Sequence, residues 1–438
     1  MAKQAKRITA AEAASLVRSR DWVDLGFGLG QPDLFEAALA ARADELEGVR
    51  IRGAFSLRPR HTLEVDPEGE HFLWLNWHFS GYDRRQHDVG RVAYIPMNFG
   101  EAPDYYRRFV DPIDVVCVKT APIDPHGYFN FGASVSYHKA LCERAKCVIV
   151  ETSAAMPYVF GAEESIHASE VDYVIEGDGA PLAELATPEP SEVDRKVGAL
   201  IAAEIEDGAC LQVGIGGMPS AVCGMLREAG VRDLGIHTEM FVDPMVDLVE
   251  SGQVTGARKR LNRFQIVYTF GYGTRRQYEF LHRNPRAQSH PVDYTNLPHN
   301  IMQNDRVISI NNTTEIDLQG QAASESSGHR HLTGTGGQLQ FVRGAYASRG
   351  GKSFICLSST YERGGVRKSR ITSQLTAGNI VTTPRTDVMY VVTEYGAVNL
   401  KGKSVAERAR ALIGLAHPDF RESLERDARE RRLLPRGW

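Results

Sequence analysis

A repeated order of elements constrains the fold of this 438-residue chain more than any other feature. The pattern predicts an apolar helix, a short strand, a glycine-rich turn and a second helix, and this order occurs twice. The two copies begin near residues 9 and 197, and their turns are Gly26–Pro32 and Gly214–Pro219. In both copies a Gly-x-Pro sequence leads into the second helix, because glycine permits unusual backbone angles and proline suits a first helical turn. We therefore predict two related halves.

The fold class follows from the strands between these turns. Residues 115–118 and 147–150 are continuous apolar runs, as expected for parallel strands buried on both faces. We predict an α/β protein made of two related open domains with mainly parallel sheets and an internal duplication. The stretch 177–190 is rich in glycine and proline and is the best linker candidate. This places an N-terminal α/β domain at 1–185 and a C-terminal domain at 186–438.

Composition excludes several classes of function. Charged residues make up 24% of the chain and the net charge is -4, so there is no basic excess for nucleic acid. The six cysteines stand singly in apolar contexts without a C-x-x-C pair, which fits buried thiols in a reducing compartment. The N-terminus has no apolar run of signal-peptide type, and no segment is apolar for long enough to span a bilayer. We therefore expect a cytoplasmic protein without membrane association.

The stretch 234–241 delivers one carboxylate, Glu239, directly before the apolar pair Met240-Phe241. Glutamate is a poor strand residue, and a carboxylate beside methionine and phenylalanine is costly unless the site uses it. Our interpretation is that the upstream turn at Gly214 holds an acidic ligand and that Glu239 attacks it. The alternative is a solvated glutamate at a strand end, and residue type alone favours that alternative.

Glycine turns also indicate an anion site in the second half. Gly214–Pro219 and a second turn, 333–337, expose backbone N–H groups that attract negative charge near a helix start. Tight packing turns are an equally weighted alternative. Neither the dinucleotide fingerprint nor the P-loop ending is present. His329 and His331 lack a third ligand at familiar spacing, so we predict no metal site. Glu239 is thus the main nucleophile candidate, with Glu315 and Glu394 as rivals.

At this point the sequence resembles a known family. The residues that carry the resemblance lie in both halves of the chain: Ile166–Tyr173, Gln212–Gly217, Gly235–Phe241, Glu315–Gln321, Gly336–Gln338 with Phe341–Ala345, Val392–Gly396 and Ala416–Arg421. Their order is similar to that in the acetyl-CoA hydrolase/transferase family. Within it the chain most resembles the 4-hydroxybutyrate and butyryl-CoA:acetate CoA-transferases.

The resemblance implies an activity and a set of site residues. It implies transfer of CoA from a short-chain acyl-CoA to a carboxylate such as acetate, with Glu239 as the nucleophile and a glutamyl-CoA thioester as the intermediate. It also implies that CoA binds at two turns, the second of which stabilises the oxyanion: Gly214, Ile215, Gly216, Gly217 and Met218; Gly334, Gly336 and Gly337. No prosthetic group is implied, because CoA is a substrate. A homo-oligomer, dimer or higher, is implied as well. One departure is Gln340, where the family usually has Asp.

Other functions stay open on the sequence. The closest is an acyl-CoA hydrolase that uses the same intermediate and passes it to water. A CoA-binding protein without turnover is a lesser alternative, and a nicotinamide oxidoreductase ranks below it because the fingerprint is missing. The acyl group is undefined: Tyr94, Phe99 and Tyr128 suit either an acyl pocket or core packing.

Overall fold

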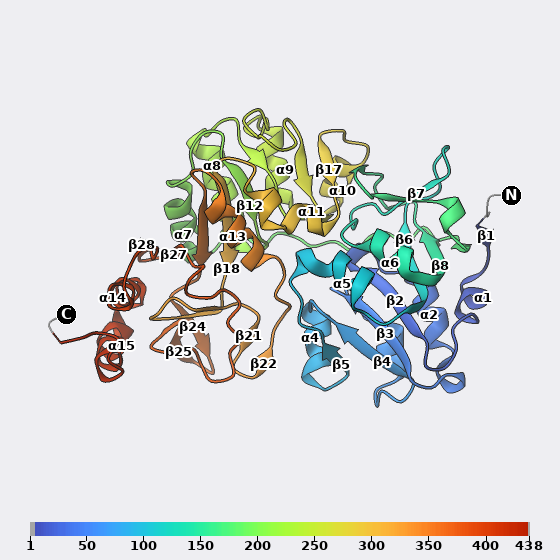
Figure 1. Ribbon diagram of the computed structural model, residues 1–438, viewed down its shortest axis with the longest axis horizontal. Helices are drawn as coiled ribbons and strands as arrows, with labels where there is room; N and C mark the ends of the chain where they lie inside the picture. The colour runs from blue at the N-terminus through green and yellow to red at the C-terminus, as the bar shows by residue number, and fades with distance from the viewer. Residues whose placement is uncertain (1–4, 437–438) are drawn as a thin grey trace. The chain divides into compact units, whose positions relative to one another are not determined.

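An eight-stranded sheet organises the first of two units in the computed structural model, which describes residues 5–436 (Figure 1). Every strand of this sheet pairs in parallel with its neighbours. From one edge to the other the strands are β1 (Lys6–Arg7), β11 (Tyr173–Ile175), β8 (Ala145–Thr152), β6 (Ile113–Thr120), β2 (Trp22–Phe27), β3 (Val49–Ala54), β4 (Phe72–Asn76) and β5 (Val92–Tyr94). The continuous apolar runs that predicted buried strands lie in β6 and β8.

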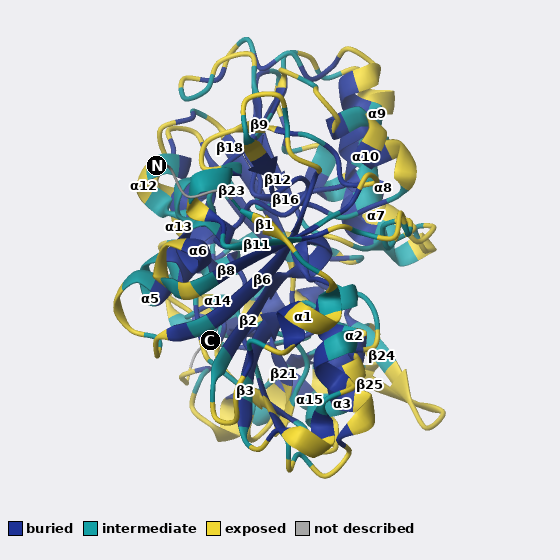
Figure 2. Ribbon diagram, turned by 90° about the vertical axis from the view of Figure 1, so that its right-hand side faces the viewer, coloured by how far each residue is buried: buried dark blue, intermediate teal, exposed yellow. Residues whose placement is uncertain are grey.

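Helices cover both faces of this sheet. Figure 2 shows the strands β2, β6 and β8 buried, with α1 and α2 on one side and α5 and α6 on the other. The main apolar cluster lies between the sheet and the first of these layers and includes Val23, Phe35 and Trp74. The helices of this unit before the linker are α1 (Ala10–Ala14), α2 (Leu34–Ala40), α3 (His61–Val65), α4 (Gly81–Asp88), α5 (Ala102–Arg108) and α6 (His138–Arg144).

A six-stranded sheet organises the second unit. Its order is β13 (Gly235–Ile236), β12 (Cys210–Val213), β18 (Val307–Asn312), β23 (Lys352–Cys356), β27 (Tyr390–Thr393) and β28 (Gly396–Asn399). All pairs are parallel except the last. Its helices are α7 (Glu192–Ala202), α8 (Gly217–Ala229), α9 (Asp243–Glu250), α12 (Pro298–Ile301), α13 (Gln338–Ala347), α14 (Val405–Leu415) and α15 (Pro418–Glu430).

The two sheets share a topology. In the first unit the chain runs from β2 to its neighbour β3, and β6 later joins the other side of β2. In the second unit β12, β13 and β18 follow the same path. In both sheets the order in which strands are added therefore reverses at the strand that precedes the repeated glycine turn, which is β2 in the first unit and β12 in the second. Open α/β sheets bind ligands at such reversal points, outside the carboxyl ends of the strands. The predicted α/β class with mainly parallel sheets is confirmed.

The units differ from the predicted division in one respect. The first unit ends its main block at Ala186 but also contains Glu239–Phe241 and Val267–Thr295. Strand pairing places these two segments in the first unit. The strand β14 (Met240–Phe241) pairs with β16 (Phe270–Gly271), and β17 (Ala287–Ser289) pairs with β9 (Phe160–Gly161). Glu239 thus lies in the first unit, whereas the predicted domain 186–438 contained it.

Hydrogen bonds attach residues 181–185 of the linker candidate 177–190 to the first unit. Tyr278 of helix α10 (Arg275–Leu281) donates to the carbonyl of Ala183 at 2.7 Å, and the Leu185 N–H donates to Gly273 at 2.9 Å. Arg58 donates to the carbonyl of Pro181. Residues 181–185 therefore form a bound strap on the first unit.

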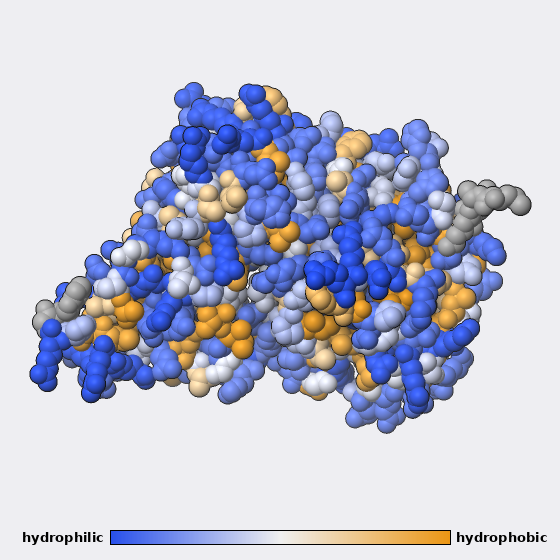
Figure 3. Space-filling model, in the orientation of Figure 1, coloured by the Kyte–Doolittle hydropathy of each residue, from blue (hydrophilic) through white to orange (hydrophobic). Residues whose placement is uncertain are grey.

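Smaller elements complete the two units. They are β7 (Tyr128–Asn130) with β10 (Ser165–His167), β15 (Ile266–Tyr268), α11 (Val292–Asn296), β19 (Glu315–Asp317) with β20 (Ala322–Ala323) and β26 (Ile371–Thr372), β21 (Ser326–Ser327) with β22 (Arg330–His331), and β24 (Thr360–Arg363) with β25 (Val366–Ser369). Among residues 5–436, no helix is long and apolar enough to cross a bilayer. The face drawn in Figure 3 is mainly hydrophilic, with apolar residues in separate patches.

Candidate active site

Glu239 is half-buried, at the point where the chain passes from β13 to β14. His237 and Thr238 before it are fully buried, and the His237 N–H donates to the Leu211 carbonyl at 3.1 Å. The carbonyl of Glu239 accepts two backbone N–H groups, from Thr269 at 3.0 Å and from Phe270 at 3.3 Å. The backbone on both sides of the carboxylate is therefore fixed, while the side chain keeps access to solvent.

An aromatic cluster lies next to this backbone within the first unit. Phe270, which pairs with Met240, packs edge-on against Phe27 with ring centroids 4.9 Å apart. Phe99 and Phe55 lie 6.1 and 6.5 Å from the same ring. Of the three aromatic residues proposed for an acyl pocket, Phe99 is the one in this cluster. Tyr94 instead packs on Phe79, and Tyr128 is 42% exposed beside His167.

The rival carboxylates have structural roles. Glu315 accepts hydrogen bonds from Thr372 Oγ1, the Thr376 N–H and hydroxyl, and Asn379 Nδ2, at 2.6–3.0 Å. Glu394 accepts from the N–H and the hydroxyl of Ser359 at 2.9 and 2.6 Å. A carboxylate that holds so many donors is a poor nucleophile, because its lone pairs are already engaged. Both rivals are therefore held as structural hydrogen-bond acceptors.

The turn Gly214–Met218 joins β12 to α8 at the carboxyl edge of the second sheet. Gly216 has φ 116°, a backbone conformation that favours glycine, and it caps the thirteen-residue helix α8. A Cβ at Gly214 would have the Ile310 carbonyl as its nearest atom, at 3.8 Å, so this part of the turn is open. Ile215 is 44% exposed. An exposed helix start of this length attracts anions through its N–H groups and its dipole.

A buried carboxylate supports the second glycine turn from below. Glu325 is 4% exposed, and Thr335, between Gly334 and Gly336, donates its hydroxyl to the Glu325 carboxylate at 2.7 Å. The backbone carbonyl of Glu325 also accepts the Leu332 N–H at 2.8 Å. Helix α13 begins at Gln338, directly after Gly337. Because α13 precedes a parallel strand, it runs antiparallel to the sheet and begins at the carboxyl edge.

Each turn of the second unit is linked to residues at or just after the end of β18. A Cβ at Gly216 would lie 3.8 Å from Asn312 Nδ2, in the last residue of that strand. On the other side Gln338 Nε2 donates to Ser324 Oγ at 2.9 Å, and Ser324 in turn donates to Thr313 at 3.1 Å. Both turns therefore lead into helix starts, at α8 and α13, and the Asp194 carboxylate lies beside the first, where a Cβ at Gly217 would be 2.7 Å from Asp194 Oδ2. Such an arrangement can hold an anionic ligand and donate to an oxyanion.

The matching turn of the first unit has a different environment. His138 is fully buried and its Nε2 accepts the Phe27 N–H at 3.0 Å. A Cβ at Gly30 would lie 2.1 Å from His138 Cε1, so the imidazole occupies the space beside the turn. Burial lowers the pKa of His138 to about 3, so the ring is neutral at pH 7. This turn is a packed joint of the kind that the alternative interpretation described.

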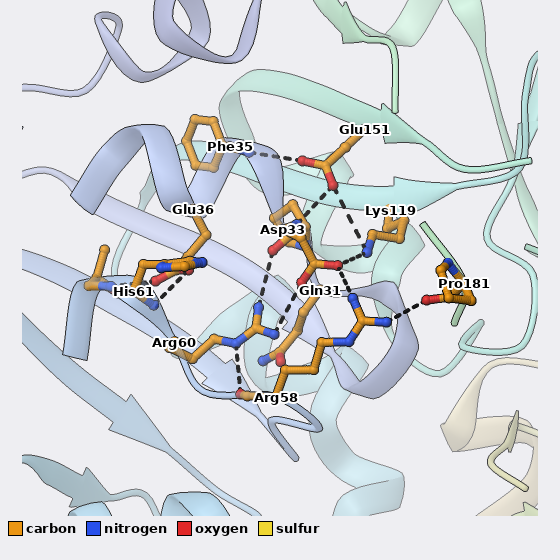
Figure 4. A network of polar contacts seen from close by, with 12 residues as sticks. Gln31, Asp33, Phe35, Glu36, Arg58, Arg60, His61, Lys119, Glu151 and Pro181 are labelled. Atoms are coloured by element: carbon orange, nitrogen blue, oxygen red, sulfur yellow. Dashed lines mark hydrogen bonds and ion pairs between the residues drawn. The ribbon is translucent and has the colours of Figure 1, made fainter. Parts of the chain in front are cut away.

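An ion network closes the remaining space beyond that turn (Figure 4). Lys119 and Arg58 both contact Asp33, and Glu151 accepts the N–H groups of Asp33 and Phe35 at 2.8 and 2.9 Å. Burial alone would raise the pKa of Asp33, but Lys119 and the two neighbouring arginines outweigh it and hold that pKa below its usual value. Burial raises the pKa of Glu151. The charged groups of Asp33, Arg58, Lys119 and Glu151 thus bind one another or nearby N–H groups.

Sequence reasoning proposed a set of site residues without the buried side chains that contact them. It selected Glu239 and both glycine turns of the second unit, and this selection stays a prediction. It missed Glu325 and Asn312, because a buried carboxylate in a polar stretch has no local signature. Among the described residues, no three His, Cys, Asp or Glu side chains are grouped as they would be around a metal ion.

Comparisons with known proteins identify relatives of this site. The acetyl-CoA hydrolase/transferase N-terminal domain matches residues 2–185, and the C-terminal domain of that family matches residues 273–428. The butyryl-CoA:acetate CoA-transferase of Anaerostipes caccae is 45% identical over 99% of this chain and 98% of its own. The 4-hydroxybutyrate coenzyme A transferase of Clostridium kluyveri is 40% identical over 97% and 98%. The crystal structure of RipA from Yersinia pestis, 39% identical, superposes with a TM-score of 0.90 over 98% of both chains.

Proposed function

The chain belongs to the acetyl-CoA hydrolase/transferase family, and from this membership we propose that it is an acyl-CoA:carboxylate CoA-transferase. It moves CoA from a short-chain acyl-CoA to a carboxylate such as acetate. The observation that carries this proposal is the alignment of three relatives named as CoA-transferases along nearly the whole chain, at 45%, 44% and 40% identity. The particular acyl group and acceptor are not part of the proposal.

The first half-reaction begins at Glu239. Its carboxylate attacks the thioester carbonyl of the acyl-CoA, and the tetrahedral oxyanion collapses with loss of the CoA thiolate. This step forms a mixed anhydride between Glu239 and the acyl group. The thiolate then attacks the Glu239 carbonyl of that anhydride and releases the first carboxylate. A glutamyl-CoA thioester remains, and every proton and electron pair is accounted for without an external base or metal.

The second half-reaction runs the same steps in reverse. The acceptor carboxylate attacks the Glu239 thioester and expels the thiolate, and the thiolate attacks the acceptor's carbonyl in the new anhydride. The new acyl-CoA leaves and the Glu239 carboxylate is restored. Kinetics of the ping-pong type follow, because the first product leaves before the acceptor reacts.

The glycine turns supply binding energy and oxyanion stabilisation. The N–H groups at the start of α8, in the turn Gly214–Met218, hold anionic groups of CoA. Gly334, Gly336 and Gly337 add donors at the start of α13, near the same strand end. Binding of the CoA portion far from the reacting bond offsets the cost of placing two anions, thiolate and carboxylate, beside one carbonyl.

A mass measurement tests the nucleophile. The protein is incubated with butyryl-CoA alone, and the peptide that contains Glu239 is expected to gain the mass of CoA less water. Glu239→Ala should lose both the adduct and transfer to acetate, while Glu228→Gln, a change at an exposed residue of α8, should keep both. Transfer that persists in Glu239→Ala without any adduct would overturn the role of Glu239.

Hydrolysis is the second candidate function, since the family is named for both activities. It shares the glutamyl-CoA intermediate and differs only in the final acceptor, which is water. Butyryl-CoA consumption with and without acetate separates the two. A transferase consumes it only to the extent that acetate is converted, whereas a hydrolase consumes it fully in both reactions.

We also propose a cytoplasmic location and a homo-oligomer. The six cysteines, all among the described residues, form no disulfide, and five of them are buried, which suits a reducing compartment. Size-exclusion chromatography with light scattering tests the oligomeric state, and a monomer at micromolar concentration would contradict it.

A further inference from the structure

A lysine in the interior of the second unit has no part in the chemistry above. Lys259 is 4% exposed, and its stem packs against Gly235 of β13, where a Cβ would lie 2.5 Å from Lys259 Cγ. Burial lowers the pKa of Lys259 to about 8. An ammonium group in the core is costly, so its contacts indicate what the position provides.

The ammonium group donates hydrogen bonds to two backbone carbonyls. Lys259 Nζ donates to the carbonyl of Ile236 at 2.9 Å and to that of Gln265 at 2.7 Å. Ile236 is the last residue of β13, and Gln265 directly precedes β15. One side chain therefore ties together two segments that have no other sequence relation.

These two segments both lead to Glu239. The chain reaches Glu239 three residues after Ile236, and it reaches Thr269 four residues after Gln265. The Thr269 N–H is the donor that binds the Glu239 carbonyl at 3.0 Å. The strand β13 has only two residues and lies at the edge of its sheet, so its own ladder restrains it weakly.

We infer that Lys259 is a positioning residue for Glu239. It fixes Ile236, where the segment leading to Glu239 begins, and Gln265, where the segment leading to Thr269 begins. This inference rests on the proposed role of Glu239. Misplacement of a nucleophile by about 1 Å can cost on the order of 100-fold in rate without weakening substrate binding. The signature of Lys259 is therefore a fall in kcat at constant KM.

The test compares two lysine variants with a matched control in the full-length protein. Lys259→Met removes the ammonium and keeps the stem. Lys259→Gln keeps a polar group but is one atom too short to reach both carbonyls. Lys352→Met is the control, because Lys352 lies on another strand, β23, and its Nζ also donates to a backbone carbonyl, that of Glu204 at 3.0 Å. Butyryl-CoA and acetate serve as substrates, and the rate of adduct formation on Glu239 is measured in a single turnover.

We expect Lys259→Met to lower kcat and the adduct rate by about 10- to 100-fold with KM for butyryl-CoA unchanged. Lys259→Gln should fall between Lys259→Met and the wild type, and Lys352→Met should keep the wild-type rate. Should Lys259→Met fail to fold, Lys259→Gln decides alone. Wild-type adduct rates in a folded Lys259 variant overturn the inference, as does an equal loss of rate in Lys352→Met. A wild-type protein that forms no adduct overturns the proposed function instead.

Discussion

The two glycine turns at the reversal points of the two sheets have diverged in what surrounds them. In the first unit the turn between β2 and α2 is filled by His138 and closed by the network around Asp33. In the second unit the turn between β12 and α8 is open at Gly214 and exposes Ile215. The topology is the same, so topology alone does not make a ligand site. What differs is which side chain approaches the turn: His138 fills the space at Gly30, whereas in the second unit Asp194 approaches Gly217 and leaves Gly214 open.

The largest expected effect comes from adding one methyl group to the filled turn. Gly30→Ala places a Cβ 2.1 Å from His138 Cε1. The three nearest atoms all belong to the His138 imidazole, so the ring itself must move. Overpacking of this kind costs about 1–3 kcal/mol or more, and we expect a lower Tm by calorimetry. The double variant Gly30→Ala/His138→Ala should recover part of the loss. No recovery would mean that the imidazole is not the obstacle.

Removal of the support under the second turn should have an intermediate effect. Thr335→Val deletes the hydroxyl that donates to Glu325 at 2.7 Å and leaves a buried carboxylate with one partner fewer. The cost of such a loss is about 1–3 kcal/mol, and the displaced turn should raise KM for butyryl-CoA. Thr335→Ser retains the hydroxyl and is the control. Equal behaviour of the two variants would exclude the hydrogen bond as the cause.

A methyl group added at Gly214 should leave the stability of the protein unchanged but weaken the binding of CoA. At Gly214 an added Cβ meets nothing closer than 3.8 Å, so Gly214→Ala should leave the free energy of unfolding within about 0.5 kcal/mol of the wild type. If CoA approaches this backbone, KM for butyryl-CoA should rise about tenfold, the equivalent of about 1.4 kcal/mol. An unchanged KM would remove Gly214 from the CoA site.

The smallest effect is a change in the pH dependence of stability. Burial lowers the pKa of His138 to about 3, whereas an unfolded histidine titrates near about 6.5. Between these values the unfolded chain binds more protons, so the stability contribution is complete above about pH 6.5 and is lost as pH falls toward 3. His138→Gln should therefore show a shallower fall of Tm across this window. A slope identical to that of the wild type would contradict the buried neutral imidazole.

Local sequence predicted the helices, strands and turns of this fold better than the long-range contacts between them. The apolar runs 115–118 and 147–150 lie in β6 and β8, and the turn predicted at Gly214–Pro219 leads into α8. Glycine and proline marked both turns, because backbone angles depend on the residue itself. The difference between the turns could not be predicted, since His138 lies more than a hundred residues from Gly30. The contacts of Glu325 and Lys259 are likewise long-range, and local patterns do not encode them.

The return of Glu239–Phe241 and Val267–Thr295 to the first unit has a consequence for synthesis on the ribosome. Domains tend to fold as they emerge, from the N-terminus onward. Here the partner of β9 is β17, which ends at Ser289, so the first unit is incomplete while its first 186 residues are already outside the exit tunnel. A nascent chain halted at residue 186 lacks those strands, so the first unit can be completed only after Thr295 has emerged.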